Sequence, residues 1–301
     1  MNLSINIGGV TWKNPVTTAS GTVNSGKEYS EYIDFGQLGA ITTKGVAPTE
    51  WLGNPTPRVV ETYGGMLNAI GLQNAGVSAF IQNDVPFLQN LDTVVIVNIC
   101  GRTAEDFVQV AQELTEAGGV DMLEVNVSCP NVKEGGVAFA QDPKATREIV
   151  SKVKKSTNLP IITKLSPNVT NIAEIAKAAE EAGSDALSLI NTLLGMKIDI
   201  RTRKPVLGNT MGGLSGPAIK PVAIRCVYQA YKAVKIPIIG MGGIMTGDDA
   251  IEFIIAGATA VAVGTANFTN PHATIDVING ITTYMQNHGI TDINDLIGIA
   301  H

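Results

Sequence analysis

Eight short apolar runs constrain the fold of this chain more than any other feature of its 301 residues. They lie at residues 15–20, 39–44, 93–98, 121–126, 161–164, 186–191, 236–243 and 260–265. Most are nearly continuous stretches of apolar residues, which is typical of strands buried on both faces of a parallel sheet. Segments with helical periodicity separate most of the runs, for example at 103–117, 142–156, 171–182 and 218–233. This alternation predicts an α/β fold, a (β/α)8 TIM barrel.

A weak internal repeat supports the barrel. The triplets at 116–118, 181–183 and 255–257 each end in Gly and each precede a short apolar run, as expected where a helix ends and leads into a strand. No low-complexity segment or polar linker divides the chain, so residues 1–301 are predicted to form a single domain. The opening segment, 2–13, is predicted to be a short N-terminal β-hairpin that turns at Gly8-Gly9 and closes the barrel bottom.

Charge and hydropathy exclude several classes of partner. The net charge is −6, the pI is about 5.1 and no basic run is present, so we expect no binding to nucleic acid. The N-terminal residues lack a positively charged segment followed by an apolar block, so no signal peptide is expected. The longest uncharged stretch, 253–275, contains Asn267, Asn270 and Pro271, which predicts a buried strand with a loop and not a membrane span.

The chain contains three widely spaced cysteines, Cys100, Cys129 and Cys226. An odd number of cysteines without a signal peptide indicates a reducing compartment and predicts a cytoplasmic protein. Three thiolates cannot hold an all-cysteine iron–sulfur cluster, which needs four, within one copy of the chain. We assign no metal site.

Polar or glycine residues end all eight apolar runs. These residues are Ser20, Lys44, Asn98, Asn126, Lys164, Asn191, Gly242-Gly243 and Gly264-Thr265. The carboxyl ends of the strands of a (β/α)8 barrel meet on one face, which carries the chemistry. The sequence therefore predicts a polar pocket at this mouth of the barrel.

The glycine-rich ends of the last two runs predict a phosphate site. Loops after the seventh and eighth strands of such barrels commonly bind phosphate through backbone N–H groups. Gly216, followed by Pro217 at the start of a predicted helix, could add another amide. A pair of glycines alone more often marks a turn, but two such loops in these positions favour phosphate.

Lysine and asparagine at the mouth indicate the kind of ligand. Lys164 is the candidate to stabilise the negative charge of a reduced flavin, and Lys44 could hold a carboxylate. Either lysine alone could equally well face solvent. Side chains that both donate and accept hydrogen bonds suit a heterocycle with alternating C=O and N–H edges, such as a pyrimidine. The candidates of this type are Asn68, Asn98, Asn126 and Asn191.

Cys129 lies three residues beyond the fourth run and precedes Pro130, so it is predicted to face the mouth. A thiol there could act as a base once it is ionised. Cys226 falls within a predicted helix and is interpreted as a small buried hydrophobic residue.

Several long motifs resemble the catalytic subunit of class 1B dihydroorotate dehydrogenases over nearly the whole chain. They span residues 53–58, 65–74, 126–133, 164–169, 190–196, 202–207, 212–223, 236–243 and 260–268. The resemblance implies an FMN-containing TIM barrel that oxidises (S)-dihydroorotate to orotate in de novo pyrimidine (UMP) biosynthesis.

The resemblance also implies the role of each matching position. Those implied to contact FMN are Ser20, Lys44, Gly45, Asn98, Asn126, Lys164, Ile190, Gly216, Gly242, Gly243, Gly264 and Thr265. Those implied to contact the substrate are Lys44, Asn68, Ala69, Ile70, Gly71, Leu72, Asn126, Asn191 and Thr192. Cys129 matches the catalytic base, which would remove a proton from C5 while hydride leaves C6 for FMN.

The electron acceptor is implied by the resemblance alone. A partner subunit carrying FAD and a [2Fe–2S] cluster would pass electrons to NAD+, in a heterotetramer built on a homodimer of this chain. The alternative within the family is a class 1A homodimer that reduces fumarate. Two readings lie outside it: a phosphosugar lyase or isomerase using Lys44 or Lys164 as a Schiff-base nucleophile, and a non-catalytic flavin-binding subunit.

Two local departures from the family pattern stand out. Residues 22–25 replace an aromatic and additional glycine, and Cys100 occupies a position where a smaller residue is usual. Both leave the expected chemistry intact, but they obscure how the first loop would cover the flavin.

Overall fold

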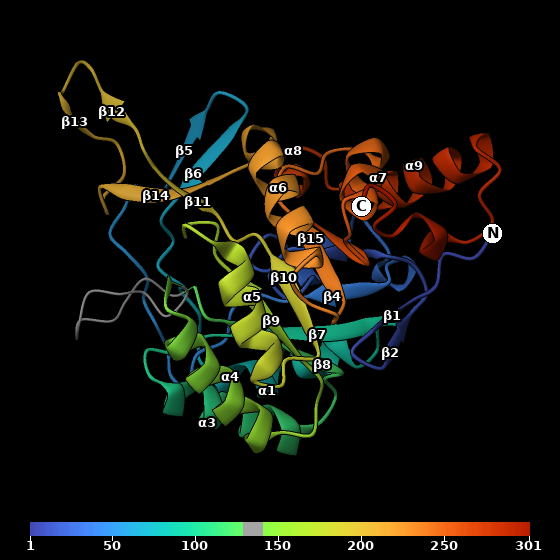
Figure 1. Cartoon of the computed structure of the whole chain (residues 1–301). Helices are drawn as coiled ribbons and strands as arrows, with labels where there is room; N and C mark the ends of the chain where they lie inside the picture. The colour runs from blue at the N-terminus through green and yellow to red at the C-terminus, as the bar shows by residue number, and fades with distance from the viewer. Residues whose placement is uncertain (129–140) are drawn as a thin grey trace.

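The computed structural model describes residues 1–128 and 141–301 and has a parallel eight-stranded sheet at its centre (Figure 1). In spatial order its strands are β3 (Val16–Thr18), β16 (Ala260–Val263), β15 (Ile238–Met241), β10 (Ala186–Leu189), β9 (Ile161–Leu165), β8 (Met122–Asn126), β7 (Val94–Ile99) and β4 (Ala40–Thr42). Each predicted run coincides with one of these strands, although β7 and β9 extend one residue beyond their runs. The predicted α/β TIM barrel is therefore confirmed.

Threonine side chains close the barrel between its first and last strands, β3 and β4. The Thr18 hydroxyl accepts a hydrogen bond from Thr42 N (3.0 Å) and donates one to Thr42 O (3.1 Å). The hydroxyls of Thr17 and Thr42 share another hydrogen bond, of 3.0 Å. All three threonines are buried. The threonine hydroxyls thus provide hydrogen bonds for backbone groups between β3 and β4, where the two strands share no backbone ladder.

Helices pack around the outside of the barrel (Figure 1). They are α1 (Val77–Asn83), α2 (Val85–Leu88), α3 (Ala104–Ala117), α4 (Pro143–Ser156), α5 (Ile172–Glu181), α6 (Lys220–Tyr231), α7 (Gly247–Ile255), α8 (Ala266–Thr269) and α9 (Ala273–Asn287). The four helical segments named from the sequence are confirmed as α3, α4, α5 and α6. Capping boxes fix the starts of α3 and α7, where Thr103 pairs with Asp106 and Thr246 with Asp249. No helix among the described residues is long and apolar enough to cross a bilayer.

The predicted N-terminal hairpin is present as β1 (Ile5–Ile7) and β2 (Val10–Trp12), which pair in antiparallel fashion. A Cβ atom on Gly8, in its turn, would lie 3.0 Å from Cβ of Asp185 and 3.5 Å from the terminal methyl of Met122. These two residues lie at the amino ends of β10 and β8. The hairpin turn therefore packs against the end of the barrel opposite the predicted mouth.

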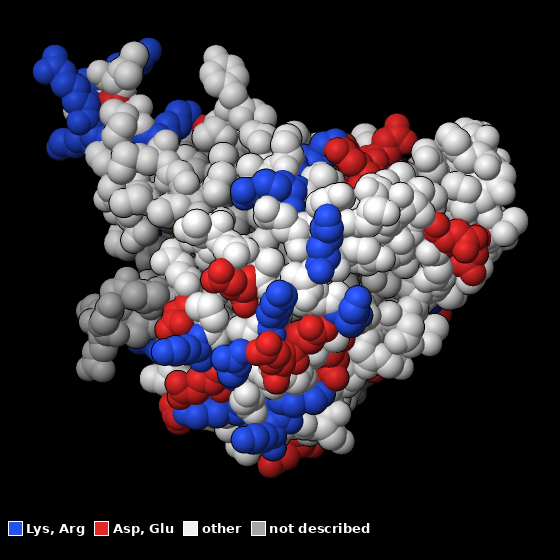
Figure 2. Space-filling view, in the orientation of Figure 1, with Lys and Arg blue, Asp and Glu red and all other residues white. Residues whose placement is uncertain are grey.

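A four-stranded antiparallel sheet, absent from the sequence prediction, projects beyond the barrel (Figure 1). Its order is β11 (Leu193–Met196), β14 (Met211–Ser215), β6 (Gly65–Asn68) and β5 (Val59–Thr62). The segment between β11 and β14 adds a small hairpin of β12 (Ile198–Asp199) and β13 (Lys204–Pro205), over which basic side chains gather in Figure 2. Strands β6, β11 and β14 contain glycine, so their sequences show little of the apolar–polar alternation that predicts a strand. A Cβ atom on Gly65 would lie 1.9 Å from Ser215 O, so β6 and β14 can approach only because glycine stands there.

Replacing Thr18 with Val should destabilise the closure of the barrel. The change would leave the buried Thr42 N–H without its acceptor, at an expected loss of about 2 kcal/mol in the free energy of unfolding. Urea denaturation would measure this loss. Thr283→Val, at an exposed position on α9, is the matched control and should change stability by less than about 0.5 kcal/mol. Equal stability of the two variants would show that the threonine bridge does not close the barrel.

Candidate active site

Strand ends from different sides of the barrel meet in the structure, as the sequence predicts. The Lys164 ammonium, on β9, donates a hydrogen bond to the hydroxyl of Ser20, just beyond β3 (2.9 Å). The Asn191 amide, beyond β10, donates to the side-chain oxygen of Asn126 at the end of β8 (3.3 Å). The mouth is therefore one polar surface built from segments far apart in the sequence.

A buried carboxylate, not selected from the sequence, lies directly beneath this surface. Glu124 on β8 accepts hydrogen bonds from the Asn98 amide (2.5 Å) and the Ser188 hydroxyl (2.7 Å), and its carboxylate is 3.4 Å from the Lys164 ammonium. We call these four residues the carboxylate cluster. Its one sequence signal is an acidic residue inside an otherwise apolar run, because a buried carboxylate needs partners.

The carboxylate cluster leaves one acceptor and one donor for a ligand. Asn98 Oδ1 is buried and has no hydrogen-bond partner among the described residues. The Lys164 ammonium has three N–H donors, and the described residues supply two acceptors for it, on Ser20 and Glu124. The strands β7 and β9, on either side of β8, thus carry an unused C=O on Asn98 and an unused N–H on Lys164. This pattern fits the edge of a heterocycle with alternating N–H and C=O groups, which the pyrimidine ring of a flavin provides.

The glycines of the predicted phosphate site lie together. A Cβ atom on Gly243 would lie 2.9 Å from Gly216 O, and one on Gly264 would lie 3.2 Å from Cβ of Ala19. Gly216, Gly242 and Gly243 all have positive φ angles, of 99°, 125° and 83°. Thr265 donates a hydrogen bond to the Ser215 hydroxyl (2.7 Å), next to Gly216. Closely packed glycine backbone of this kind can place N–H groups around an anion.

Asn126 and Asn191 belong to a chain of amide hydrogen bonds. Asn191 Oδ1 accepts a hydrogen bond from Thr192 N (2.8 Å). The Thr192 carbonyl accepts one from the Asn168 amide (3.1 Å), and Asn168 Oδ1 accepts another from Leu194 N (2.8 Å). Asn168 is not among the site residues predicted from the sequence, although it lies within the motif at 164–169. The chain fixes the loop that follows β10.

Asn68 reaches the mouth from the antiparallel sheet. Its amide donates a hydrogen bond to Gly213 O on the neighbouring strand (3.4 Å), and a Cβ atom on Gly213 would lie 2.0 Å from the Thr192 hydroxyl. Gly213 therefore lies between Asn68 and Thr192, two predicted substrate contacts. The residues that follow Asn68 are held by Asn54, whose N–H donates to Ile70 O (3.0 Å).

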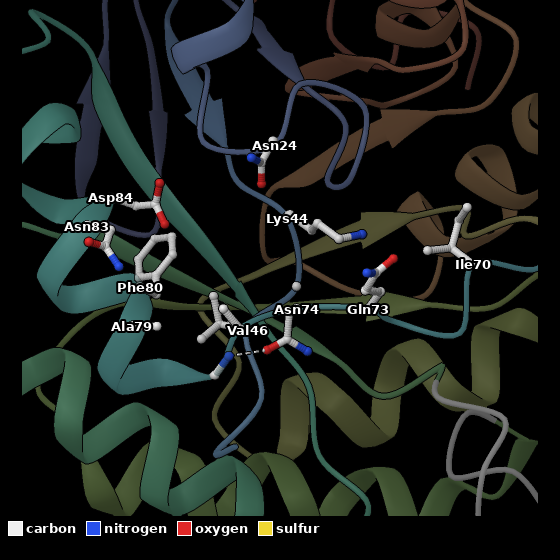
Figure 3. A pocket seen from close by; sticks show the side chains of 13 residues that line it. Asn24, Lys44, Val46, Ile70, Gln73, Asn74, Ala79, Phe80, Asn83 and Asp84 are labelled. Atoms are coloured by element: carbon white, nitrogen blue, oxygen red, sulfur yellow. Dashed lines mark hydrogen bonds between the residues drawn. The ribbon is translucent and has the colours of Figure 1, made fainter. Parts of the chain in front are cut away.

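Lys44 lines a pocket of about 430 Å³ between the loop after β4 and helix α1. Figure 3 shows its side chain extending away from Asp84, on the side of the pocket where Gln73 and Ile70 lie. The described residues offer the Lys44 ammonium no hydrogen-bond acceptor or salt-bridge partner. Burial lowers the pKa of Lys44 below its ordinary value of 10.5; nearby Arg58 lowers it further and Cys100 opposes the shift. An anionic ligand would supply the missing partner.

The predicted base, Cys129, lies outside the described residues. The other two cysteines are buried, and neither is among the predicted site residues. Cys226 lies on α6 with 1% of its surface exposed, as predicted, and burial raises the pKa of its thiol.

The family model for dihydroorotate dehydrogenase matches residues 2–285. Two relatives are described as the catalytic subunit of dihydroorotate dehydrogenase B (NAD(+)). The one from Lachnoclostridium phytofermentans is 61% identical over 298 residues, 99% of each chain. The one from Desulforamulus reducens is 62% identical over 301 residues, 100% of this chain and 99% of the relative.

A crystal structure of DHODH from Eimeria tenella in complex with ferulenol superposes on this chain with a TM-score of 0.83. The two sequences are 26% identical, and the match covers 100% of this chain and 89% of the other. With a family model matched over nearly the whole sequence and close relatives of the same length, the chain belongs to the dihydroorotate dehydrogenase family.

Proposed function

We propose that this chain oxidises (S)-dihydroorotate to orotate, in de novo pyrimidine biosynthesis, with FMN as the hydride acceptor. The observation that carries the proposal is the pairing of unused donor and acceptor groups, on Lys164 and Asn98, at the mouth of a barrel of this family. The family match favours this function over a phosphosugar lyase or isomerase, which the barrel alone would allow.

FMN would be held by two parts of the mouth. The glycine loops around Gly216 and Gly243, with Thr265, would bind the phosphate through backbone N–H groups. Asn98 and Lys164 would hydrogen-bond the pyrimidine end of the ring. The remaining proposed contacts are Ser20, Lys44, Gly45, Asn126, Ile190, Gly242 and Gly264. Gly45 is suited to this place, because a Cβ atom there would lie 2.9 Å from Asn98 Oδ1 and displace that amide.

The substrate would lie between the Asn126–Asn191 pair and the segment Asn68–Leu72, with Thr192 beside it. The amides of Asn68, Asn126 and Asn191 can both donate to and accept from a pyrimidine ring. The Lys44 ammonium would pair with the orotate carboxylate, since it lacks a partner among the described residues and its partial burial strengthens such a pairing.

The Cys129 thiolate would remove the proton from C5, and the C5–C6 double bond of orotate forms as hydride leaves C6. When bound at the mouth by the residues named above, FMN would supply the acceptor for this hydride. The asparagine amides would hold C5 and C6 in place for the two bond cleavages, and Lys44 would fix the carboxylate attached to C6.

The reduced cofactor needs an electron acceptor, which we propose is a partner subunit with FAD and a [2Fe–2S] cluster that reduces NAD+. The relatives' printed description, the catalytic subunit of an NAD(+) enzyme, supports a separate partner. The three cysteines of this chain cannot supply four cluster ligands. The assembly would be a cytoplasmic heterotetramer built on a homodimer of this chain.

Anaerobic addition of dihydroorotate to the purified protein should bleach the absorption of a bound flavin, because the proposed reaction transfers a hydride to it. Visible spectroscopy measures the change. Orotate is the control ligand: it should perturb the spectrum without bleaching it. A colourless protein that does not take up added FMN, or a flavin that dihydroorotate leaves oxidised, would refute the proposed function.

The same bleached sample tests the acceptor. Fumarate should not restore the flavin colour at a catalytic rate, because electrons are proposed to leave through a second subunit. Rapid recolouring by fumarate would contradict the two-subunit proposal and support the class 1A alternative.

Cys129→Ala should reduce kcat for dihydroorotate oxidation by at least about 100-fold while FMN stays bound, because general-base catalysis contributes roughly 10²–10⁴. Stopped-flow flavin reduction would measure the loss. Cys226→Ala, which removes a buried thiol from α6, is the matched control and should keep near wild-type turnover. A wild-type reduction rate in Cys129→Ala would disprove the assignment of the base.

A further inference from the structure

Among the residues that the structure describes, Glu124 is the one buried acid at the mouth, and no step of the proposed reaction uses it. It lies on β8 with 3% of its side chain exposed, and the Lys164 side chain is 5% exposed. Asn98 and Lys164 come from the strands on either side, β7 and β9, and Ser188 comes from β10, one strand further along the sheet. Four consecutive strands of the barrel thus converge on one carboxylate.

Strand register explains why these side chains meet. Asn98 is paired with Glu124 across β7 and β8, and Lys164 with Ser188 across β9 and β10. Paired residues on neighbouring strands point to the same face of a sheet, here the barrel interior. A shift of one residue in either pairing would turn one member of the cluster outwards. The strand register of the barrel therefore fixes the relative positions of the four residues of the carboxylate cluster.

The charges and hydrogen bonds of the cluster nearly balance. The Glu124 carboxylate receives two neutral donors and faces one ammonium, so the pair with Lys164 adds no net charge to the interior. Removing one member of such a buried pair leaves an uncompensated charge, which is strongly unfavourable. One Lys164 N–H and Asn98 Oδ1 have no hydrogen-bond partner among the described residues. Both groups belong to residues that interact with Glu124.

We infer that Glu124 is a positioning residue that directs Lys164 and Asn98 towards the flavin and, by offsetting the Lys164 charge, lowers the reduction potential of the bound cofactor. This inference rests on the proposed function for the identity of the cofactor. An unbalanced ammonium beside the ring would stabilise the negative charge that a flavin gains on reduction and so hold the electrons more tightly. The Glu124 carboxylate reduces this stabilisation of the reduced flavin, and the lower reduction potential favours transfer of the electrons to the next acceptor.

Glu124→Gln tests the electrostatic part. Glutamine has the same shape, and its amide can be accommodated: Oε1 can face Asn98 and Lys164 while Nε2 donates to the Ser188 hydroxyl. Loss of the negative charge should shift the two-electron equilibrium with a redox dye at least about tenfold towards reduced flavin, which corresponds to about 30 mV. Anaerobic dye equilibration measures this without any substrate turnover.

Glu116→Gln is the matched control, because it removes the same charge from an exposed position at the end of α3. Its equilibrium should stay within about twofold of wild type. If Glu124→Gln behaves like Glu116→Gln, the inference is wrong although the proposed function stands. If the wild-type protein binds no flavin, the proposed function is what fails.

Thermal unfolding without cofactor provides a second test that needs no flavin. Lys164→Met should lower the melting temperature by several degrees, because it leaves the Glu124 carboxylate buried without its cation. Adding Glu124→Gln to Lys164→Met removes that charge and should recover part of the loss. A double variant that melts below Lys164→Met would show that Glu124 is not a charged partner of Lys164, and would overturn the inference.

Discussion

The buried pairing of Glu124 with Lys164 is the interaction on which the mouth of this barrel depends. A lysine at the end of β9 can point into the interior only if its charge is compensated there, and the carboxylate on β8 provides that compensation at 3.4 Å. The same carboxylate fixes the Asn98 amide through a 2.5 Å hydrogen bond. A ligand at the mouth therefore meets groups that are already oriented, so little ordering remains to be done when it binds.

The rest of the mouth is formed above the carboxylate cluster by segments that do not belong to the eight-stranded sheet. The antiparallel sheet brings Asn68 to Gly213, next to Thr192, and the loop after β10 is fixed through Asn168. Lys44 has no hydrogen-bond or salt-bridge partner for its ammonium among the described residues, and its pKa is lowered mainly by burial. This arrangement suits a site in which the carboxylate cluster holds a tightly bound cofactor. The surrounding loops and the antiparallel sheet then bind a substrate that exchanges with solvent.

The barrel and much of its mouth could be predicted because their signals are local. Each strand is a buried apolar run, and each run ends in a polar or glycine residue such as Asn98, Lys164 or Gly243. Glu124 was missed because its one local signal is an acidic residue inside an apolar run, and its three partners are distant in sequence. The antiparallel sheet was missed because β6 and β14 rely on glycines such as Gly65, which weaken the strand pattern while allowing close approach.

A crystal structure of the chain grown with FMN and orotate would test the central claim most directly. We expect the pyrimidine edge of the flavin to lie within hydrogen-bond distance of both Lys164 Nζ and Asn98 Oδ1, with the Glu124 carboxylate still beneath them. A flavin bound away from these two atoms, or a Lys164 side chain turned away from Glu124 in the complex, would contradict the account.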